Sequence, residues 1–305
     1  MLTARVLFYR TFFIFYLPIE GNVVSSVLLI ECNPLHLYFL DSLEIMSLEL
    51  LQAPPTTVVS TSGEMIRLTS GLDLILPCWN PSGPWVESLI RHYHEVTTIM
   101  GKVPVQLILV NDGSVKNFTA QHIAWLEAAI PNIIIVSYTR NRGKGYAVRE
   151  GVKRSQHAFQ VYTDLDFPFG IYAVKEAYDR LIQGLDVVAG ERGAAYLREL
   201  PRKRRIITRI SRALNRVVLD LKVEDAQAGL KGFNAYGRNI LLKTQIDGFL
   251  YDSEFLYHAG KRPHIKIGAV AVSCRPGIQF SSFRMKLLMK ELLNYCRIVI
   301  GSKAA

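Results

Sequence analysis

Cysteine pairs that could bind a metal or form a redox motif are absent from the sequence. The four cysteines stand at positions 32, 78, 274 and 296, and no two of them have the C-x-x-C spacing. We therefore expect free thiols in a reducing compartment and no zinc site.

A long uninterrupted apolar run is also missing. Near the start of the chain, Arg10, Pro18 and Glu20 interrupt or separate the hydrophobic stretches 6–17 and 23–30. These pieces fall well short of the roughly 20 apolar residues that a membrane-spanning helix needs. No small-residue cleavage site follows them clearly, so neither a transmembrane helix nor a secretory signal is predicted.

What the chain does have is length, apolar content and positive charge. Its 305 residues are 50% hydrophobic and 20% charged, which is enough to bury a large core and excludes a disordered polymer. The net charge of +10 favours anionic partners such as nucleotides, phospholipid surfaces or nucleic acid. Nucleic acid is not expected, because few aromatic residues accompany the basic clusters.

Three regions are expected along the chain. Residues 1–65 form an N-terminal extension, in which 52–64 is rich in Pro, Ser and Thr and is typical of a linker. This extension is interpreted either as an arm that associates with a membrane or as sequence upstream of the functional start. Residues 66–280 form the main domain, and residues 281–305 form an amphipathic helix.

Strand and helix patterns alternate from residue 72 onward. Buried-strand patterns at Leu72–Pro77, Val105–Val110, Ile133–Tyr138, Phe159–Thr163 and Asp186–Ala189 are separated by helical patterns at 84–100, 119–129, 146–155 and 171–183. Strands joined by helices predict βαβ units, and therefore a mostly parallel, Rossmann-like α/β sheet with helices on both faces.

The strand that ends at Thr163 leads into two carboxylates, Asp164 and Asp166. Residues two apart in an extended chain point to the same side, so both acids can be aimed at one point beyond the carboxyl edge of the sheet. Paired carboxylates suit Mg²⁺ or Mn²⁺, whose coordination shell is completed by substrate phosphates and water. An isolated D-x-D is more often a solvated acidic loop, and the ends of the other strands decide between the two interpretations.

Polar or glycine-rich segments follow the other strands. They are Pro77-Cys78-Trp79-Asn80, Asn111-Asp112-Gly113-Ser114 and Asn141-Arg142-Gly143-Lys144-Gly145. Each by itself is typical of a turn or a solvated loop. Together at one edge they indicate a ligand site, in which carboxylates accept hydrogen bonds from a ribose or base and glycines allow Lys144 to approach phosphate.

On these motifs, residues 70 to 280 resemble the family 2 glycosyltransferases of GT-A fold, and within them the dolichyl- and polyprenyl-phosphate glucosyltransferases. The family's P-x-Y-N, D-D-G-S, N-x-G-K-G and D-x-D segments appear here as PCWN, NDGS, NRGKG and TDLD. Its D-T-Q-x-G-x-K-x-F and D-x-E-F segments match residues 225–233 and 252–255. There are two departures: Asn111 replaces the first acid, and Pro168 replaces a glutamine that ligates metal in related mannosyl synthases.

The resemblance implies roles for particular residues. Asp164 and Asp166 would bind Mg²⁺ or Mn²⁺, and Asp166, Asp225 and Asp252 would be catalytic. The residues implied to contact the nucleotide sugar are Pro77, Trp79, Asn80, Asn111, Asp112, Lys144, Asp164 and Gln227.

The segment 191–216 is strongly basic. Arginines about four apart on a helix after Pro201 would share a face, and guanidinium groups grip phosphate through paired hydrogen bonds. The resemblance implies that Arg192, Arg205 and Arg209 meet the phosphate of the acceptor; a solvated basic helix is the alternative. The amphipathic segment 281–305 would either lie in an anionic bilayer interface or dock on the core of the domain.

We therefore expect an inverting, metal-dependent glycosyltransferase that moves a hexose from a nucleotide sugar, UDP-glucose or another such as GDP-mannose, to a polyprenyl phosphate. It would act as a peripheral protein at the cytoplasmic face of a membrane. One alternative keeps the fold but uses a saccharide hydroxyl in cell-envelope polysaccharide synthesis, with Asp252 or Asp225 as general base. Two others belong to different classes: a nucleotidyltransferase, and a non-catalytic protein that binds anions or membranes.

Overall fold

The computed structural model describes residues 69–275 without interruption and, outside them, residues 7–9, 12–14, 57–59, 65–67, 294, 295 and 298. The chain divides into two compact units, Met1–Pro54 and Pro55–Ala305. In the first unit, β1 (Leu7–Tyr9) pairs antiparallel with β2 (Phe12–Ile14). In the second, β3 (Thr57–Val59) pairs antiparallel with β4 (Met65–Arg67), so part of the expected linker is a strand, as its β-branched residues favour.

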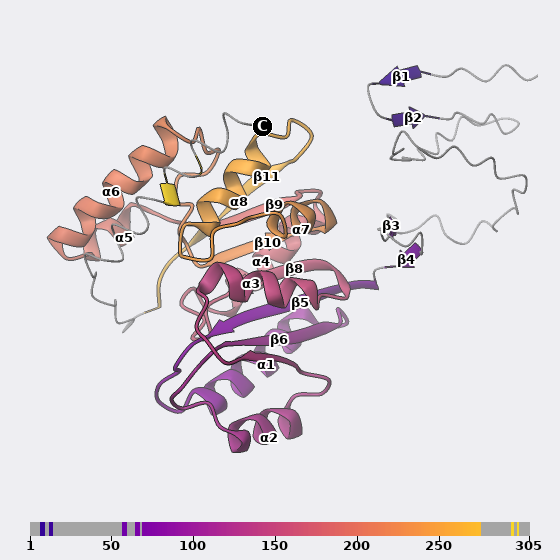
Figure 1. The fold of residues 1–305 in the computed structure, drawn as a ribbon, viewed down its shortest axis with the longest axis vertical. Coiled ribbons are helices and arrows are strands. Elements are labelled where there is room, and N and C mark those ends of the chain that lie inside the picture. Colours follow the sequence, from indigo (N-terminus) through magenta and orange to yellow (C-terminus); the bar gives the residue numbers. More distant parts are fainter. Residues whose placement is uncertain are drawn as a thin grey trace, which may run out of the picture. The chain divides into compact units, whose positions relative to one another are not determined.

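A seven-stranded sheet is the centre of the second unit (Figure 1). Its strands are β5 (Thr69–Cys78), β6 (Val105–Asp112), β7 (Ile134–Tyr138), β8 (His157–Thr163), β9 (Val187–Arg192), β10 (Leu230–Phe233) and β11 (Ile267–Val272). The spatial order is β11-β9-β10-β8-β5-β6-β7, and β10 runs antiparallel to both of its neighbours while the remaining pairs are parallel. The predicted mostly parallel α/β sheet is confirmed.

Helices cover both faces of this sheet (Figure 1). The helices of this unit in the described residues are α1 (Trp85–Met100), α2 (Ala120–Ala129), α3 (Lys144–Lys153), α4 (Ile171–Ile182), α5 (Ala194–Glu199), α6 (Arg202–Val217), α7 (Ala235–Leu241) and α8 (Tyr251–Gly260). Leu74 belongs to the core under α1 and α4, whereas Ile75 belongs to the core under α3, α7 and α8. Because both faces are buried, the central strands are continuous apolar runs, which is why they can be recognised in the sequence.

The order of the strands creates a switch point beside β5. The chain runs outward from β5 through β6 to β7 and then returns to the other side of β5 as β8. Since β5 to β8 are mutually parallel, the loops that follow them all leave from one edge of the sheet. In open α/β sheets, ligands bind in the crevice at such an edge.

The predicted C-terminal amphipathic helix, 281–305, lies outside the described residues except at three positions. Asn294, Tyr295 and Ile298 are helical and buried, and the last two belong to the core on the α8 side of the sheet. Their contacts agree with the docking alternative at those positions. Within the described part of the chain, every helix is too short or too polar to cross a bilayer.

Candidate active site

Two carboxylates lie where β8 ends, at the switch point of the sheet. The Oδ1 atom of Asp164 accepts a hydrogen bond from Lys144 Nζ at 2.5 Å. Asp166 is exposed at the next turn, and partial burial together with the charge of Asp164 raises the pKa of its carboxyl group. Burial would lower the pKa of Lys144, but the carboxylates of Asp164 and Asp252 raise it, so the ammonium group is charged. The structure thus brings both predicted metal ligands and the lysine of the NRGKG loop together.

The turn that leads into β10 packs against this point. A Cβ atom built on Gly229 would lie closer than 3.0 Å to Asp164 Oδ2, 3.1 Å from Asp164 Cγ and 3.2 Å from Lys144 Nζ. Only glycine lets the backbone approach the two side chains so closely. The segment after Asp225 and the acid pair, which are far apart in the sequence, therefore form one wall.

Asp112 holds the glycine-rich loop in place. Its carboxylate is 4% exposed and accepts hydrogen bonds from the backbone N–H groups of Arg142 (2.7 Å) and Gly143 (3.0 Å) and from Asn141 Nδ2 (2.8 Å). These bonds fix the loop from which Lys144 reaches Asp164. The predicted contact of Asp112 with a nucleotide remains a prediction, and its visible role is to position the loop.

The loops after β5 and β6 are joined by Asn80. Its Oδ1 accepts from the N–H groups of Val115 (2.9 Å) and Lys116 (3.0 Å), and its own N–H donates to Ser114 Oγ (2.8 Å). Asn111 Oδ1 accepts from the N–H of Ser114 at 2.9 Å. Both asparagines, predicted to contact the nucleotide, therefore shape the two loops that border the ligand edge.

Trp79 and Pro77 lie on the same edge, at the end of β5. Trp79 has 58% of its surface exposed, and Pro77 is half-buried. An exposed indole offers a flat apolar surface on which a planar ligand can stack. Of the predicted nucleotide-contact residues at the end of β5 and directly after it, Trp79 is the one whose side chain is displayed to solvent.

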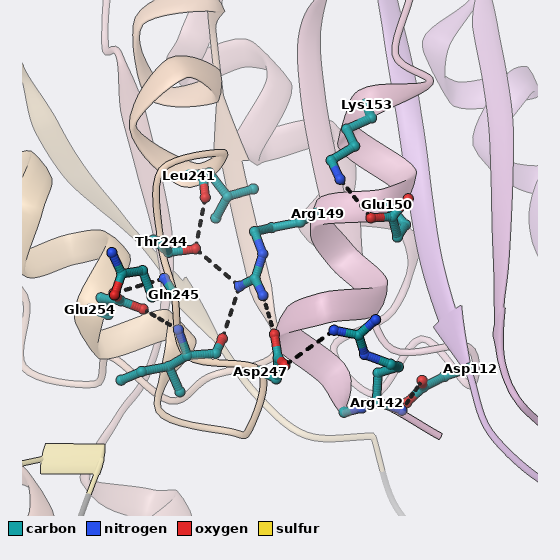
Figure 2. A network of polar contacts seen from close by, with 12 residues as sticks. Asp112, Arg142, Arg149, Glu150, Lys153, Leu241, Thr244, Gln245, Asp247 and Glu254 are labelled. Atoms are coloured by element: carbon teal, nitrogen blue, oxygen red, sulfur yellow. Dashed lines mark hydrogen bonds and ion pairs between the residues drawn. The ribbon is translucent and has the colours of Figure 1, made fainter. Parts of the chain in front are cut away.

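Arg149 fixes the turn before α8 against helix α3, as Figure 2 shows. The arginine is 8% exposed and donates to Thr244 Oγ1 (3.2 Å) and to the carbonyl of Ile246 (2.9 Å), and it pairs with Asp247. Sequence reasoning gave none of these residues a role. A charged residue among the buried positions of an otherwise apolar helix face was the available signal.

The same turn meets the glycine-rich loop. The N–H of Gly145 donates to the carbonyl of Asp247 at 2.9 Å. Glu254 accepts from the N–H groups of Gln245 (2.9 Å) and Ile246 (2.8 Å), which closes the turn from the side of α8. Because an acceptor outside the helix, the carbonyl of Asp247, satisfies the first-turn amide of Gly145, α3 begins at Lys144, earlier than predicted.

Asp225 is held by two arginines. Arg192 donates from Nε at 2.6 Å and from Nη2 at 2.8 Å, and Arg212 Nη2 donates at 2.9 Å. Burial raises the pKa of Asp225, but the hydrogen bonds and charge of Arg192 outweigh it and hold the pKa below 3.8. The predicted catalytic acid Asp225 and the predicted phosphate ligand Arg192 are therefore engaged with each other.

Asp252 lies in a buried cluster with Tyr162 and Lys231. It is 4% exposed, Tyr162 donates a hydrogen bond to its Oδ1, and Lys231 Nζ lies 3.5 Å from the same atom. Lys231 is fully buried and also donates to the carbonyl of Ala228 at 2.6 Å; burial lowers its pKa. Lys231 thus ties the 225–229 turn to Asp252. A lysine within the apolar strand LKGF was the signal that sequence reasoning did not use.

The other predicted residues lie on or beside α6. Arg205 Nη2 donates to the carbonyls of Arg198 (2.7 Å) and Leu200 (3.0 Å), so it braces its own chain. Arg209 is exposed. Gln227 is exposed, and its Oε1 accepts from Ser211 Oγ at 3.4 Å. Of the three arginines predicted for the acceptor phosphate, Arg209 is the one displayed to solvent.

Arg275 closes the loop that carries the acid pair. Its N–H donates to the carbonyl of Pro168 at 2.8 Å, and its guanidinium group donates to the carbonyl of Asp166 and lies 3.2 Å from His92 Nε2. The strand β11 is thereby linked to the acid loop. Sequence reasoning assigned Arg275 no role.

The acid pair is suited to a divalent cation. An ammonium group already stands against Asp164, and the side chain of Asp166 projects from an exposed turn. Among the described residues, no group of three or more His, Cys, Asp or Glu is placed to hold a metal by itself. Mg²⁺ and Mn²⁺ are usually bound by one or two carboxylates, and phosphate and water fill their remaining coordination positions.

The mixed sheet, with one antiparallel strand and an acid pair at its switch point, defines an α/β enzyme of GT-A fold. The chain belongs to glycosyl transferase family 2, whose sequence profile matches residues 73–239. The family expected from the sequence is therefore confirmed. This membership argues against the two interpretations from other classes, a nucleotidyltransferase and a non-catalytic binding protein.

Individual relatives are more distant. A dolichyl-phosphate beta-glucosyltransferase of Dictyostelium discoideum is 27% identical over 229 residues, which is 72% of this chain and 65% of that protein, so the chain spans less than two thirds of its length. Mannosyl-3-phosphoglycerate synthase from Rubrobacter xylanophilus superposes with a TM-score of 0.51 at 14% identity, covering 75% of this chain and 73% of that one. The mannosyltransferase PcManGT from Pyrobaculum calidifontis, solved with GDP-Man and Mn²⁺, gives 0.46 at 15% identity over 74% of this chain and 62% of that one.

Proposed function

We propose that the protein is an inverting, metal-dependent glycosyltransferase that moves a hexose from UDP-glucose to a polyprenyl phosphate at the cytoplasmic face of a membrane. The observation that carries the proposal is the meeting of Asp164, Asp166 and Lys144 at the switch point of the sheet. Glucose and a lipid-phosphate acceptor are supported by the similarity to a dolichyl-phosphate beta-glucosyltransferase.

The donor would lie across the loops that the structure joins at this edge. Trp79, with its exposed indole, would stack on the base. The ammonium group of Lys144 would leave Asp164 and bind the diphosphate of the donor. Because Asp112 fixes the loop that carries Lys144, a rotation of the lysine side chain is enough to reach the new acceptor. A Mg²⁺ or Mn²⁺ held by Asp164 and Asp166 would neutralise charge on the departing nucleoside diphosphate.

A phosphate acceptor agrees with the state of the buried acids. A hydroxyl acceptor needs a carboxylate to take its proton, whereas a phosphate is already ionised near neutral pH. Asp225 is occupied by Arg192 and Arg212, and Asp252 is occupied by Tyr162 and Lys231. Both carboxylate oxygens of Asp225 are engaged, and Asp252 is buried with its Oδ1 engaged, which favours the phosphate over the saccharide alternative.

The test is a panel of nucleotide sugars offered to the full chain with Mn²⁺ or Mg²⁺. Each reaction contains either a short-chain polyprenyl phosphate or a soluble oligosaccharide, and mass spectrometry of both acceptors records the added hexose. We expect a hexosyl lipid phosphate from UDP-glucose and no product without metal. Transfer to the oligosaccharide alone would replace the proposal with the hydroxyl-acceptor alternative.

A further inference from the structure

Helix α6 has two faces of different character. One face is attached to the active site: Arg212 Nη2 donates to Asp225 and to the carbonyl of Arg192 at 2.9 and 2.8 Å, Ser211 contacts Gln227, and Asn215 is 2% exposed. The helix also lacks acidic residues along its whole length, Arg202–Val217. In Figure 1, α6 lies with α5 at the margin of the second unit.

The opposite face is displayed to solvent. Its positions recur at the three- and four-residue spacing that places side chains on one side of a helix. The exposed residues of this face are Arg202, Ile206, Arg209, Ile210, Ala213, Arg216 and Val217. We call these residues the α6 outer face.

Aliphatic and basic side chains form separate rows on the α6 outer face. Ile206 and Ile210 expose 58% and 55% of their surface, and Val217 exposes 80%. Arg202, Arg209 and Arg216 recur every two helical turns beside them. An exposed aliphatic row usually marks a contact surface, and a basic row along it selects an anionic partner.

We propose that the α6 outer face docks on an anionic lipid bilayer. The aliphatic row would enter the boundary between headgroups and acyl chains, and Arg202 and Arg209 would meet lipid phosphates, whereas Arg216 is paired with Glu224 at 2.9 Å. This inference rests on the proposed function, because it places the site-facing side of the same helix, with Arg212 and Asp225, within reach of a phosphate embedded in that bilayer. Helix α6 is suited to this role because one of its faces contacts residues of the site and the opposite face is exposed to the bilayer.

Vesicle binding of the full chain tests the inference without any polyprenyl phosphate present. Co-sedimentation is measured with vesicles of phosphatidylcholine alone and of phosphatidylcholine mixed with phosphatidylglycerol. The chain is expected to bind the anionic vesicles selectively. The R202Q/R209Q variant should bind them about twenty-five-fold more weakly, since each interfacial arginine contributes about fivefold. The I206S/I210S variant should bind them about tenfold more weakly.

Matched controls come from exposed residues elsewhere. I182S removes an isoleucine that is 56% exposed on α4, and R154Q removes an exposed arginine at the end of α3; both should bind as the unchanged chain does. Thermal unfolding checks that each variant is folded, which is expected because the altered side chains are exposed.

Several outcomes separate this inference from the proposed function. If the unchanged chain ignores anionic vesicles yet glycosylates a short, soluble polyprenyl phosphate, the docking surface is refuted and the function stands. If binding is selective and depends on the α6 outer face but no lipid phosphate is glycosylated, the surface stands and the function fails. The remaining outcome is a dimer, detected by sedimentation, that dissociates in the I206S/I210S variant while the chain binds no vesicles. This result would assign the α6 outer face to contact with a second copy and overturn the inference.

Discussion

Replacing Gly229 with alanine perturbs the acid pair without removing any of its groups. The added Cβ would lie closer than 3.0 Å to Asp164 Oδ2 and 3.1 Å from its Cγ, whereas ordinary contacts are 3.4–4 Å. Asp164 must therefore shift by about 1 Å. A displacement of that size at a reacting centre lowers turnover about a hundredfold, or about 2.7 kcal/mol of transition-state stabilisation.

The effect on stability should be small by comparison. The close contact falls on the end of a side chain, and the backbone of Gly229 does not have the left-handed conformation that disfavours alanine. The free energy of unfolding is therefore expected to change by less than about 1 kcal/mol. Gly260, at the end of α8, is the control, because a Cβ placed there meets nothing within 4 Å.

The assay pairs nucleoside-diphosphate release with calorimetric titration of Mn²⁺ and UDP. G229A should lose about a hundredfold in kcat/KM and bind Mn²⁺ with UDP more weakly, while G260A matches the unchanged chain in both. Urea unfolding of all three proteins establishes that they are equally folded. If G229A turns over normally while folded, the position of Asp164 does not govern the reaction and the argument from the wall is refuted.

Further predictions concern the buried ion pairs. The pKa of Asp225 is lower in the folded chain than in the unfolded chain, where the carboxyl takes up its proton near pH 3.8. The free energy of unfolding should therefore fall as the pH drops below about 4. Urea unfolding at several pH values should show that the D225N variant lacks this part of the pH dependence. K231M should lower the free energy of unfolding in urea by about 3 kcal/mol, because it leaves the carboxylate of Asp252 buried without its cation. The double variant K231M/D252N should recover part of that loss. If the single and double variants lose equal stability, the two residues are not energetically paired. R149M should lower the free energy of unfolding by about 2 kcal/mol, and R154M by less than about 0.5 kcal/mol, in thermal and urea unfolding. Similar losses for the two variants would show that Arg149 does not hold the turn before α8.

Much of the sheet could be predicted because its strands are buried on both faces. Runs such as Leu107–Val110 have no polar interruption, and the polar segments after them mark the carboxyl edge. LKGF, the antiparallel strand, was not predicted, because four residues that include a lysine are too few to show a strand periodicity. The strand in residues 57–59 was obscured by the surrounding Pro, Ser and Thr, which are typical of linkers.

The acids and the loop lysine were recognisable, but their partners were not. Asp225 and Asp252 were recognisable as acids within motifs. Only the three-dimensional structure reveals that Asp225 pairs with Arg192 and Asp252 with Lys231. Such pairings join residues far apart in the chain, so no local spacing encodes them. The same holds for Arg149, whose partners lie in a turn nearly a hundred residues later.

The most direct measurement of the central claim compares metal-dependent transfer by D166A and by E127A, which alters an exposed acid on α2. Both variants and the unchanged chain are incubated with UDP-glucose, Mn²⁺ and a short polyprenyl phosphate, and hexosyl lipid phosphate is quantified by mass spectrometry. The unchanged chain and E127A should form product at equal rates, and D166A should be about a thousandfold slower. Undiminished transfer by folded D166A, or equal transfer by the unchanged chain in the presence of a chelator, would contradict the claim that this acid pair drives the reaction.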